Sequence, residues 1–563
     1  MEQTRRRAGA SEGMQSGAVP GMPYVTALSE PLLTLPQGQP FTLDHACQGV
    51  QIFGGTGAGK TSGSGKALAQ AFLRAGFGGL VLCAKTDEAE NWARYAEACG
   101  RGDDLVLFNA EHGAGFNFLD YEMATAKTTQ NVVHVLMNVI KAGQNRAMAG
   151  TSDPFWDNTV EELLGNCIDA LYAAYGAVRL QDVFAMVHTA ARSPKEGYDP
   201  KWREKSFNFQ TIMRAAGDPA VPIDKEDLDA IGDYFGYNWA NLSERTRSNV
   251  VATFSSMVSR FRRGALREMF TKDTTMVPEF SHEGAILVID LPIKAWGQDG
   301  IIAAHIWKYA WQRATERRVT GPGTRPVFLW ADESQFFVSE YDAEFQSTAR
   351  SSRTSTVYLT QNINAYEHAI GGATAHATVR AFLGNLRTQI FHQNTNLDTN
   401  QYAAELVGRQ MHWRQSVSDG FSNGRTWSQT AGRGESIQRG QSQNVGSSWN
   451  EGLNSSASHT RTGGPGGGSE STSYSSGSNA SQGATTSRGS SWSQGASRQA
   501  SVSSGKNTGT SHNESWQEQK DFVLEPDFFR TRLRTGGRQC AGIVDAVLVG
   551  PNLPQYLLCS FRQ

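Results

Sequence analysis

Apolar and polar residues follow two different patterns in the first 120 residues. Residues 41–43, 49–53, 78–83 and 104–109 are short apolar runs of strand length, whereas residues 62–75 carry apolar side chains at helical spacing. A chain that alternates strands with helices usually forms a parallel sheet with helices on both faces. The pattern therefore predicts an α/β domain that begins near residue 41.

The same alternation returns after residue 275, with strands expected over residues 285–291, 326–331, 355–360 and 387–393 and a helix over residues 301–317. Residues 120–275 lie between the two alternating parts. Their apolar positions have helical spacing, chiefly at 131–141, 157–175, 180–190 and 248–263. We therefore predict one sheet domain, formed by residues 41–119 and 276–414, with residues 120–275 inserted into it as an all-α domain.

Composition changes the expectation at both ends of this domain. Residues 1–40 are rich in Gly, Pro and small polar residues, which is typical of a flexible arm. Residues 415–517 are dominated by Ser, Gly, Gln, Asn and Thr and cannot bury much apolar surface, so we predict a long disordered insert. Residues 543–549 and 555–561 again have strand character. The C-terminal segment, residues 518–563, is therefore expected to return to the sheet.

Charge and cysteine content narrow the class of protein. The 52 Lys and Arg residues against 54 Asp and Glu residues give a formal net charge of -2, which excludes a protein whose whole surface is basic. A local basic channel remains possible. The six cysteines form no CxxC pair, and no apolar run approaches the roughly 18 residues of a membrane-spanning helix. We expect a cytoplasmic protein.

One segment matches the phosphate-binding pattern GxxxxGK[ST] at every position: Gly54, Gly55, Thr56, Gly57, Ala58, Gly59, Lys60 and Thr61. Glycines allow backbone N–H groups to converge on phosphate oxygens. Lys60 would reach the β- and γ-phosphates, and the Thr61 hydroxyl would bind Mg²⁺. An apolar strand precedes the loop and a helix follows it, which is the setting that this motif requires.

A second candidate constellation ends the apolar run over residues 327–331. Asp332 and Glu333 would lie at the carboxyl edge of the sheet, beside the phosphates. Asp332 would hold Mg²⁺ through water, and Glu333 would polarise the attacking water. Together with the phosphate-binding loop, this acid pair predicts an ATPase.

Two further candidates surround the strand at 355–360. Gln361, in the sequence Thr-Gln-Asn at the strand tip, is a candidate sensor of the γ-phosphate, although Thr360 or Asn362 could instead cap a helix. Arg350 precedes the strand and could reach the γ-phosphate of a neighbouring subunit, although most surface arginines are only solvated.

With these motifs the chain resembles the TraG/TraD-type coupling ATPases of conjugative type IV secretion, which group with FtsK- and HerA-like DNA translocases. The resemblance covers about residues 45–413 and, weakly, 519–563. It rests on the loop, on Leu-Trp-Ala-Asp-Glu ending at Glu333, on Thr-Gln-Asn around Gln361 and on Arg350 eleven residues before that glutamine. Residues 82–88 are similar to the family's Asp-Pro-Lys-Gly-Glu stretch, with Lys85 kept and the first Asp replaced.

The resemblance implies a RecA-like domain, ATP as the nucleotide, and a homo-hexamer that moves DNA through a central channel. It also implies a relaxase or other substrate adaptor as partner, together with the membrane components of the secretion system. Five arginines are candidates for the channel surface, although solvation alone is the more common role of such a residue: Arg260, Arg262, Arg263, Arg317 and Arg318.

The chain departs from the family in two ways. Typical members begin with two transmembrane helices, and this sequence shows none, so we expect at most a peripheral association with the inner membrane through partners. The Ser/Gly/Gln-rich insert is the second departure. Three other functions therefore stay open: a coupling ATPase for protein effectors, a HerA-like translocase in defence or repair, and a nucleotide-dependent switch.

Overall fold

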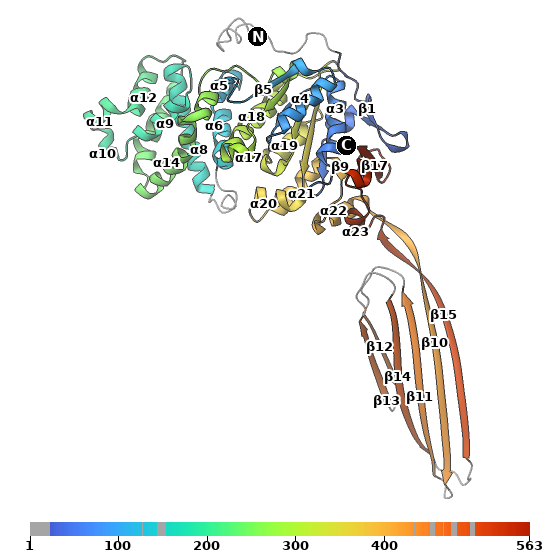
Figure 1. The fold of residues 1–563 in the computed structure, drawn as a ribbon. Coiled ribbons are helices and arrows are strands. Elements are labelled where there is room, and N and C mark those ends of the chain that lie inside the picture. Colours follow the sequence, from blue (N-terminus) through green and yellow to red (C-terminus); the bar gives the residue numbers. More distant parts are fainter. Residues whose placement is uncertain are drawn as a thin grey trace. The chain divides into compact units, whose positions relative to one another are not determined.

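The computed structural model describes residues 23–126, 128–143, 154–431, 435–450, 457–464, 467–474, 481–495 and 502–563 (Figure 1). The chain divides into two compact units. The first consists of the residues up to Val407 together with Leu524–Gln563, and the second consists of Gly408–Val523.

A nine-stranded sheet, counted over the described residues, organises the first unit. Its strand order is β17-β16-β9-β3-β8-β7-β4-β6-β5. The bounds are β3 Val50–Phe53, β4 Gly78–Leu82, β5 Leu105–Phe108, β6 Ile286–Ile289, β7 Val327–Ala331, β8 Thr354–Thr360, β9 Thr388–Phe391, β16 Ile543–Val549 and β17 Leu557–Arg562. The strands from β9 to β5 pair in parallel, and β16 and β17 are added antiparallel at the β9 edge. The predicted α/β fold is confirmed.

Helices pack on both faces of this sheet. They are α2 Leu43–Cys47, α3 Lys66–Arg74, α4 Glu88–Ala98, α16 Phe280–Glu283, α17 Ile293–Trp296, α18 Gln298–Arg317, α19 Tyr341–Thr348, α20 Ile363–Ile370, α21 Ala375–Asn385, α22 Leu397–Val407 and α23 Pro526–Thr531. On one face, Phe328 of β7 contacts Phe72 of α3 and Trp92 of α4. On the other face, Phe108 of β5 contacts Trp307 of α18. Side chains of a strand point alternately to its two faces, so a strand covered on both faces is apolar along its whole length, as β4, β6 and β7 are.

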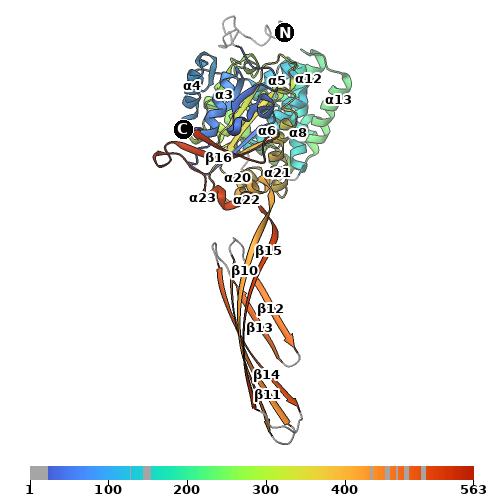
Figure 2. The ribbon, with the colours of Figure 1, turned by 90° about the vertical axis from the view of Figure 1, so that its right-hand side faces the viewer.

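The region between β5 and β6 contains helices alone among its described residues. They are α5 Phe118–Ala126, α6 Thr129–Gly143, α8 Pro154–Tyr175, α9 Leu180–Thr189, α10 Pro194–Gly197, α11 Pro200–Lys205, α12 Phe207–Gly217, α13 Lys225–Asp233, α14 Glu244–Val258 and α15 Gly264–Phe270. Figure 2 shows α8, α12 and α13 together at one side of this unit. Among these residues, no helix is long and apolar enough to cross a bilayer.

Part of the predicted flexible arm is ordered. Pro31–Thr34 (β1) pairs antiparallel with Pro40–Thr42 (β2), and Leu35 and Phe41 are buried in the same core cluster as α3. The prediction of an arm through residue 40 is therefore wrong from Pro31 onward. The hairpin packs against the sheet domain. Burial of Leu35 and Phe41 there stabilises it, although Pro and Gly interrupt its apolar residues.

The second unit contains the segment, residues 415–517, that was predicted to be a disordered insert. Its described residues form antiparallel strands: β10 Arg409–Ala431, β11 Glu435–Asn450, β12 Ala457–Gly464, β13 Gly467–Tyr474, β14 Ser481–Gly495 and β15 Val502–Phe522. Four of them form a sheet in the order β14-β11-β10-β15, and β12 pairs with β13, as Figures 1 and 2 show. Strand β10 pairs with β15 in one continuous register from Arg409↔Phe522 to Gln429↔Val502. Backbone hydrogen bonds between long strands do not require an apolar core. The composition argument considered only whether such a core could form.

Candidate functional site

The segment Gly54–Thr61 begins directly after β3, at the carboxyl edge of the parallel sheet. Gly57 and Gly59 have positive φ angles of +74° and +84°, a conformation that favours glycine. A Cβ atom on Gly59 would also lie 2.6 Å from a methyl carbon of Val544 in β16. The loop conformation therefore depends on glycine at these positions, as the phosphate-binding motif predicts. A π-helical turn over Thr61–Gly65 (η2) then leads into α3.

Lys60 lies buried against this loop. Its Nζ atom donates hydrogen bonds to the carbonyl oxygens of Gly54 at 2.7 Å and Gly55 at 3.3 Å. Burial lowers the pKa of Lys60, and the carboxylates of Asp332 and Glu333 oppose that shift. The carbonyl oxygens of Gly54 and Gly55 therefore hold the ammonium group against the loop in which a phosphate would bind.

Asp332 joins this loop to the predicted acid pair at the end of β7. Its buried Oδ2 atom accepts a hydrogen bond of 2.8 Å from the Thr61 hydroxyl. Its Oδ1 atom accepts one of 2.8 Å from the backbone N–H of Glu333. The structure therefore brings together two residues 271 positions apart that were both predicted to hold Mg²⁺.

Glu333 adopts a left-handed backbone conformation, with φ +50° and ψ +45°. That conformation is costly for a non-glycine residue and is most often found at functional sites. Its Oε2 atom accepts a hydrogen bond of 2.9 Å from Gln335 Nε2, and Gln335 Oε1 accepts one of 2.8 Å from the Thr360 hydroxyl at the tip of β8. Gln335 thus links the proposed base to the strand tip that was predicted to sense phosphate.

Gln361 follows Thr360, which pairs in register with Phe53, the residue before the loop. Gln361, which is partly buried, is therefore the first residue after a strand that lies beside β3 and its loop. Asn362 instead caps α20, because its side chain accepts a hydrogen bond of 2.9 Å from the N–H of Ala365. The structure thus assigns the cap to Asn362 and the contact with Gln335 to Thr360.

Lys85 belongs to this site, although the sequence assigned it no role. Its Nζ atom lies 2.8 Å from Asp332 Oδ2 and 3.5 Å from Glu333 Oε1. Burial alone would lower the pKa of Lys85, but the two carboxylates raise it above its usual value. Lys85 was visible in the sequence only as the lysine kept in the stretch at residues 82–88.

Glu88 fixes the loop that carries Lys85. Its Oε2 atom accepts hydrogen bonds from the backbone N–H groups of Ala84 at 2.6 Å and Lys85 at 3.2 Å. Burial first, and then the charge of Asp332, raise the pKa of Glu88 well above its usual value. A third carboxyl group therefore lies close to the acid pair.

The C-terminal hairpin β16–β17 contacts the helix that follows the loop. His392 bridges the two, with 2.7 Å from its Nε2 atom to the Ser64 hydroxyl and 3.1 Å from its Nδ1 atom to the carbonyl oxygen of Asp545. Burial lowers the pKa of His392 to about 3, so the ring is neutral near pH 7. A carbonyl can only accept, so Nδ1 carries the proton and Nε2 accepts from Ser64. Gln563 adds a hydrogen bond of 2.9 Å to Ser62.

Arg350 does not lie near the other predicted residues of its own chain. It precedes β8 at the amino edge of the sheet, opposite the loop, and its Nε atom lies 2.6 Å from Asp44 Oδ1. Three of the candidate channel arginines have partners elsewhere: Arg317 pairs with the buried Glu122 at 3.1 Å, Arg318 donates to the carbonyl of Arg325, and Arg260 pairs with Asp299 at 2.6 Å. Arg317 and Arg318 stabilise the fold of the first unit.

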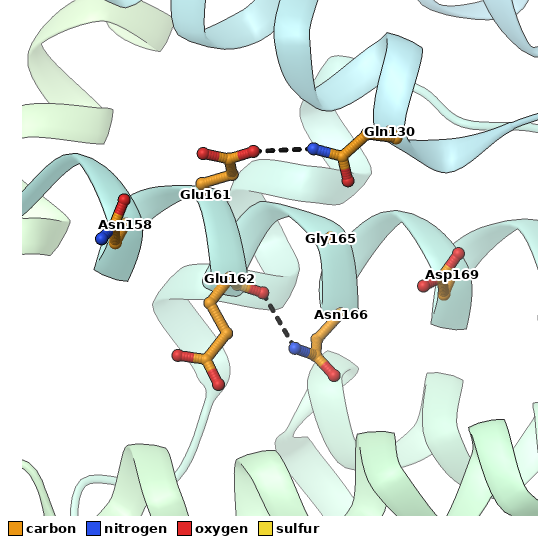
Figure 3. Close-up of a pocket in the computed structure, with 7 residues that line it drawn as sticks. All are labelled: Gln130, Asn158, Glu161, Glu162, Gly165, Asn166 and Asp169. Atoms are coloured by element: carbon orange, nitrogen blue, oxygen red, sulfur yellow. Dashed lines mark hydrogen bonds between the residues drawn. The ribbon is translucent and has the colours of Figure 1, made fainter.

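A separate cavity of about 400 Å³ lies in the helical region, between α6 and α8. Figure 3 shows its acidic and amide side chains, among them Glu161, Glu162 and Asp169, with Gln130 Nε2 donating to Glu161 Oε1 at 2.7 Å. None of the residues predicted for nucleotide chemistry lines it. The described residues include no group of three or more His, Cys, Asp or Glu side chains that could hold a metal ion.

Comparison with known proteins adds a family match. Residues 326–447 match the family model described as the TraM recognition site of TraD and TraG. Over these residues the chain is similar to the TraG/TraD family, and we call them the TraG/TraD-type segment. The TraG/TraD-type segment includes β7 with the acid pair, β8 and β9. A search of curated proteins found no match.

The chain was also compared with solved structures. The bacterial conjugative coupling protein TrwBΔN70, in an unbound form, superposes with a TM-score of 0.51 at 12% identity, covering 95% of this chain and 89% of that one. The plasmid coupling protein TrwB in complex with ADP and Mg²⁺ has a TM-score of 0.45 at 15% identity, covering 69% and 80% of the two chains. The likeness to TrwBΔN70 is a likeness of fold, and it agrees with the mixed α/β architecture described above.

Proposed function

We propose that this chain is an ATP-hydrolysing coupling protein that moves DNA toward a type IV secretion system. The observation that carries the proposal is the position of Asp332, whose carboxylate accepts hydrogen bonds from the Thr61 hydroxyl and from the backbone N–H of Glu333. The family match over residues 326–447 supports the cellular setting, because that model describes a recognition segment of TraD and TraG.

The site fits a magnesium–nucleotide complex. The Thr61 hydroxyl and the Asp332 carboxylate are hard oxygen donors, which Mg²⁺ prefers, and they already face each other at 2.8 Å. When bound, Mg²⁺ would neutralise charge on the β- and γ-phosphates. Lys60 would bind the same phosphates from the loop, and backbone N–H groups of Gly55–Lys60 would surround them.

Hydrolysis would use Glu333 as the base. Its carboxylate would accept a proton from water as the water oxygen attacks the γ-phosphorus, and ADP would leave with the electrons of the broken P–O bond. Gln335 holds the Glu333 carboxylate at 2.9 Å and therefore restricts its position. Gln361, directly after β8, would sense the γ-phosphate.

We further propose that Arg350 acts between subunits of a homo-hexamer. It lies too far from the loop of its own chain to contact nucleotide there, and its side chain is 59% exposed. Chains of Arg350→Ala mixed with chains of Lys60→Ala should hydrolyse ATP faster than either alone, because some interfaces would then combine an intact Arg350 with an intact loop. Arg387→Ala is the control for the Arg350 substitution, because Arg387 is also an exposed arginine at the same edge of the sheet. Equal rates for the mixture and the separate variants would contradict a role between subunits.

DNA should stimulate hydrolysis by this chain several-fold. A translocating ring couples hydrolysis to contact with the polymer, so the steady-state rate should rise with single-stranded or duplex DNA, and the preferred form identifies the substrate. The measurement is phosphate release by the full chain, with Lys60→Ala as the control for contaminating activity. A Lys60-dependent rate that does not respond to DNA would contradict DNA as the cargo and favour a protein effector.

The partners that we propose follow from the same reasoning. The TraG/TraD-type segment would bind a substrate adaptor of the relaxase complex, because the family description names TraM recognition. Association with the inner membrane would occur through the membrane components of the secretion system. A partner nuclease in place of a relaxase would instead indicate a HerA-like translocase.

A further inference from the structure

Lys85 and Thr61 share one oxygen atom of Asp332. Lys85 Nζ lies 2.8 Å from Oδ2, and the Thr61 hydroxyl donates to the same atom at 2.8 Å. Lys85 also reaches Glu333 Oε1 at 3.5 Å, so a single ammonium group contacts both acids of the pair. The inference below rests on the proposed function, since it concerns the metal that ATP hydrolysis requires.

The position of Lys85 is built into the sheet. Strands β4 and β7 are neighbours, and Leu82 pairs in register with Ala331, the residue before Asp332. The segment after β4 is then fixed by Glu88, which accepts hydrogen bonds from two of its backbone N–H groups. The Lys85 side chain is only 28% exposed, so the ion pair is partly shielded from water and stronger than a surface pair.

We propose that Lys85 competes with divalent metal for the acid pair, so that metal enters this site only together with nucleotide. An ammonium group and a metal ion cannot contact the same carboxylate face at once, because two cations at that distance repel each other strongly at partly buried positions. Free metal would have to displace Lys85 without the help of any nucleotide contact. A metal–nucleotide complex displaces it with the added contacts of Lys60 and the loop to phosphate. Lys85 is thus a positioning residue that holds Asp332 and Glu333 in place until the substrate binds.

The test is direct metal binding by the full chain without nucleotide or DNA. Mn²⁺ is the probe, and free Mn²⁺ is measured by electron paramagnetic resonance. Lys85→Met should bind Mn²⁺ at least about tenfold more tightly than the wild-type chain, because the competing charge is gone. Lys85→Met combined with Asp332→Asn should lose that gain. Lys85→Arg should stay close to wild type, and Lys205→Met, an exposed lysine of α11 with the same change of charge, is the matched control.

The proposal is overturned if Lys85→Met binds Mn²⁺ no better than wild type, or if its gain survives Asp332→Asn. It is also overturned if the wild-type chain binds free Mn²⁺ tightly and Asp332→Asn abolishes that binding. This outcome is measured on the unsubstituted chain, so it does not depend on whether Lys85→Met folds. Neither result depends on DNA stimulation. Failure of the proposed translocase function and failure of this inference are therefore distinguishable.

Discussion

Glu333→Gln is expected to lower kcat for ATP hydrolysis by about two to four orders of magnitude, the usual contribution of a positioned general base. Glutamine keeps the size of the side chain and an oxygen that can accept the hydrogen bond from Gln335. It cannot take a proton from the attacking water. Nucleotide affinity should change by less than about threefold, because no phosphate contact is assigned to Glu333. Single-turnover hydrolysis and equilibrium binding of a fluorescent ATP analogue measure the two quantities separately.

Glu340→Gln is the control for this substitution, since Glu340 is exposed and lies after the same strand. If Glu333→Gln retains more than about a tenth of the wild-type kcat, Glu333 is not the base. Glu88 would then be the next carboxyl group to test, because it is close enough to Asp332 for the charge of Asp332 to raise its pKa. The strained backbone at Glu333 would in that case need a different explanation.

The parts of the site that lie together in the sequence were predictable. Gly54–Thr61 is a contiguous motif, and Asp332 and Glu333 end an apolar strand, so the carboxyl-edge rule for parallel sheets was sufficient to place them together. Lys85 was not predictable in this way. Its partner Asp332 lies 247 residues further along, and no local pattern shows which lysine after a strand turns toward a neighbouring strand.

The roles of Gln335 and His392 depend on side-chain geometry that a sequence does not contain. Gln335 is unremarkable as the second residue after an acid pair, and its importance comes from bridging Glu333 to Thr360. The sequence pattern predicted His392 only as part of a strand. Its hydrogen bond to Asp545 exists because β16 pairs with β9. The return of the C-terminal strands was expected from their apolar pattern, but their contact with the phosphate-binding loop was not.

The prediction for residues 415–517 rested on composition alone. The composition argument asks whether a segment can bury apolar surface, and residues 415–517 cannot. The described strands instead satisfy their backbone groups by pairing with one another over long continuous registers. Low hydrophobicity therefore excludes a packed core in such a segment without excluding regular strands.

Lys60→Ala is expected to abolish nucleotide-dependent hydrolysis and to weaken ATP binding by about a hundredfold, the loss of two charge-assisted hydrogen bonds. The Lys60 ammonium group lies inside the loop, held by the carbonyl oxygens of Gly54 and Gly55, and would donate charge-assisted hydrogen bonds to the phosphates. Alanine removes those bonds and leaves the glycine conformations unchanged. Folding stability without nucleotide should change little, because burial of the charge already lowers the pKa of Lys60 and its loss relieves that desolvation cost.

Thermal unfolding with and without a slowly hydrolysed ATP analogue and Mg²⁺ separates these two effects. A ligand at a hundred times its Kd stabilises a protein by about 2.7 kcal/mol, so the wild-type Tm should rise clearly on adding the analogue. Lys60→Ala should start from a similar Tm and show almost no rise at the same concentration. Lys66→Ala, six residues further on in α3, should behave like wild type. A full ligand-induced rise in Lys60→Ala would mean that Lys60 serves only to hold the loop, and that phosphate is bound by the backbone and other cations of the site.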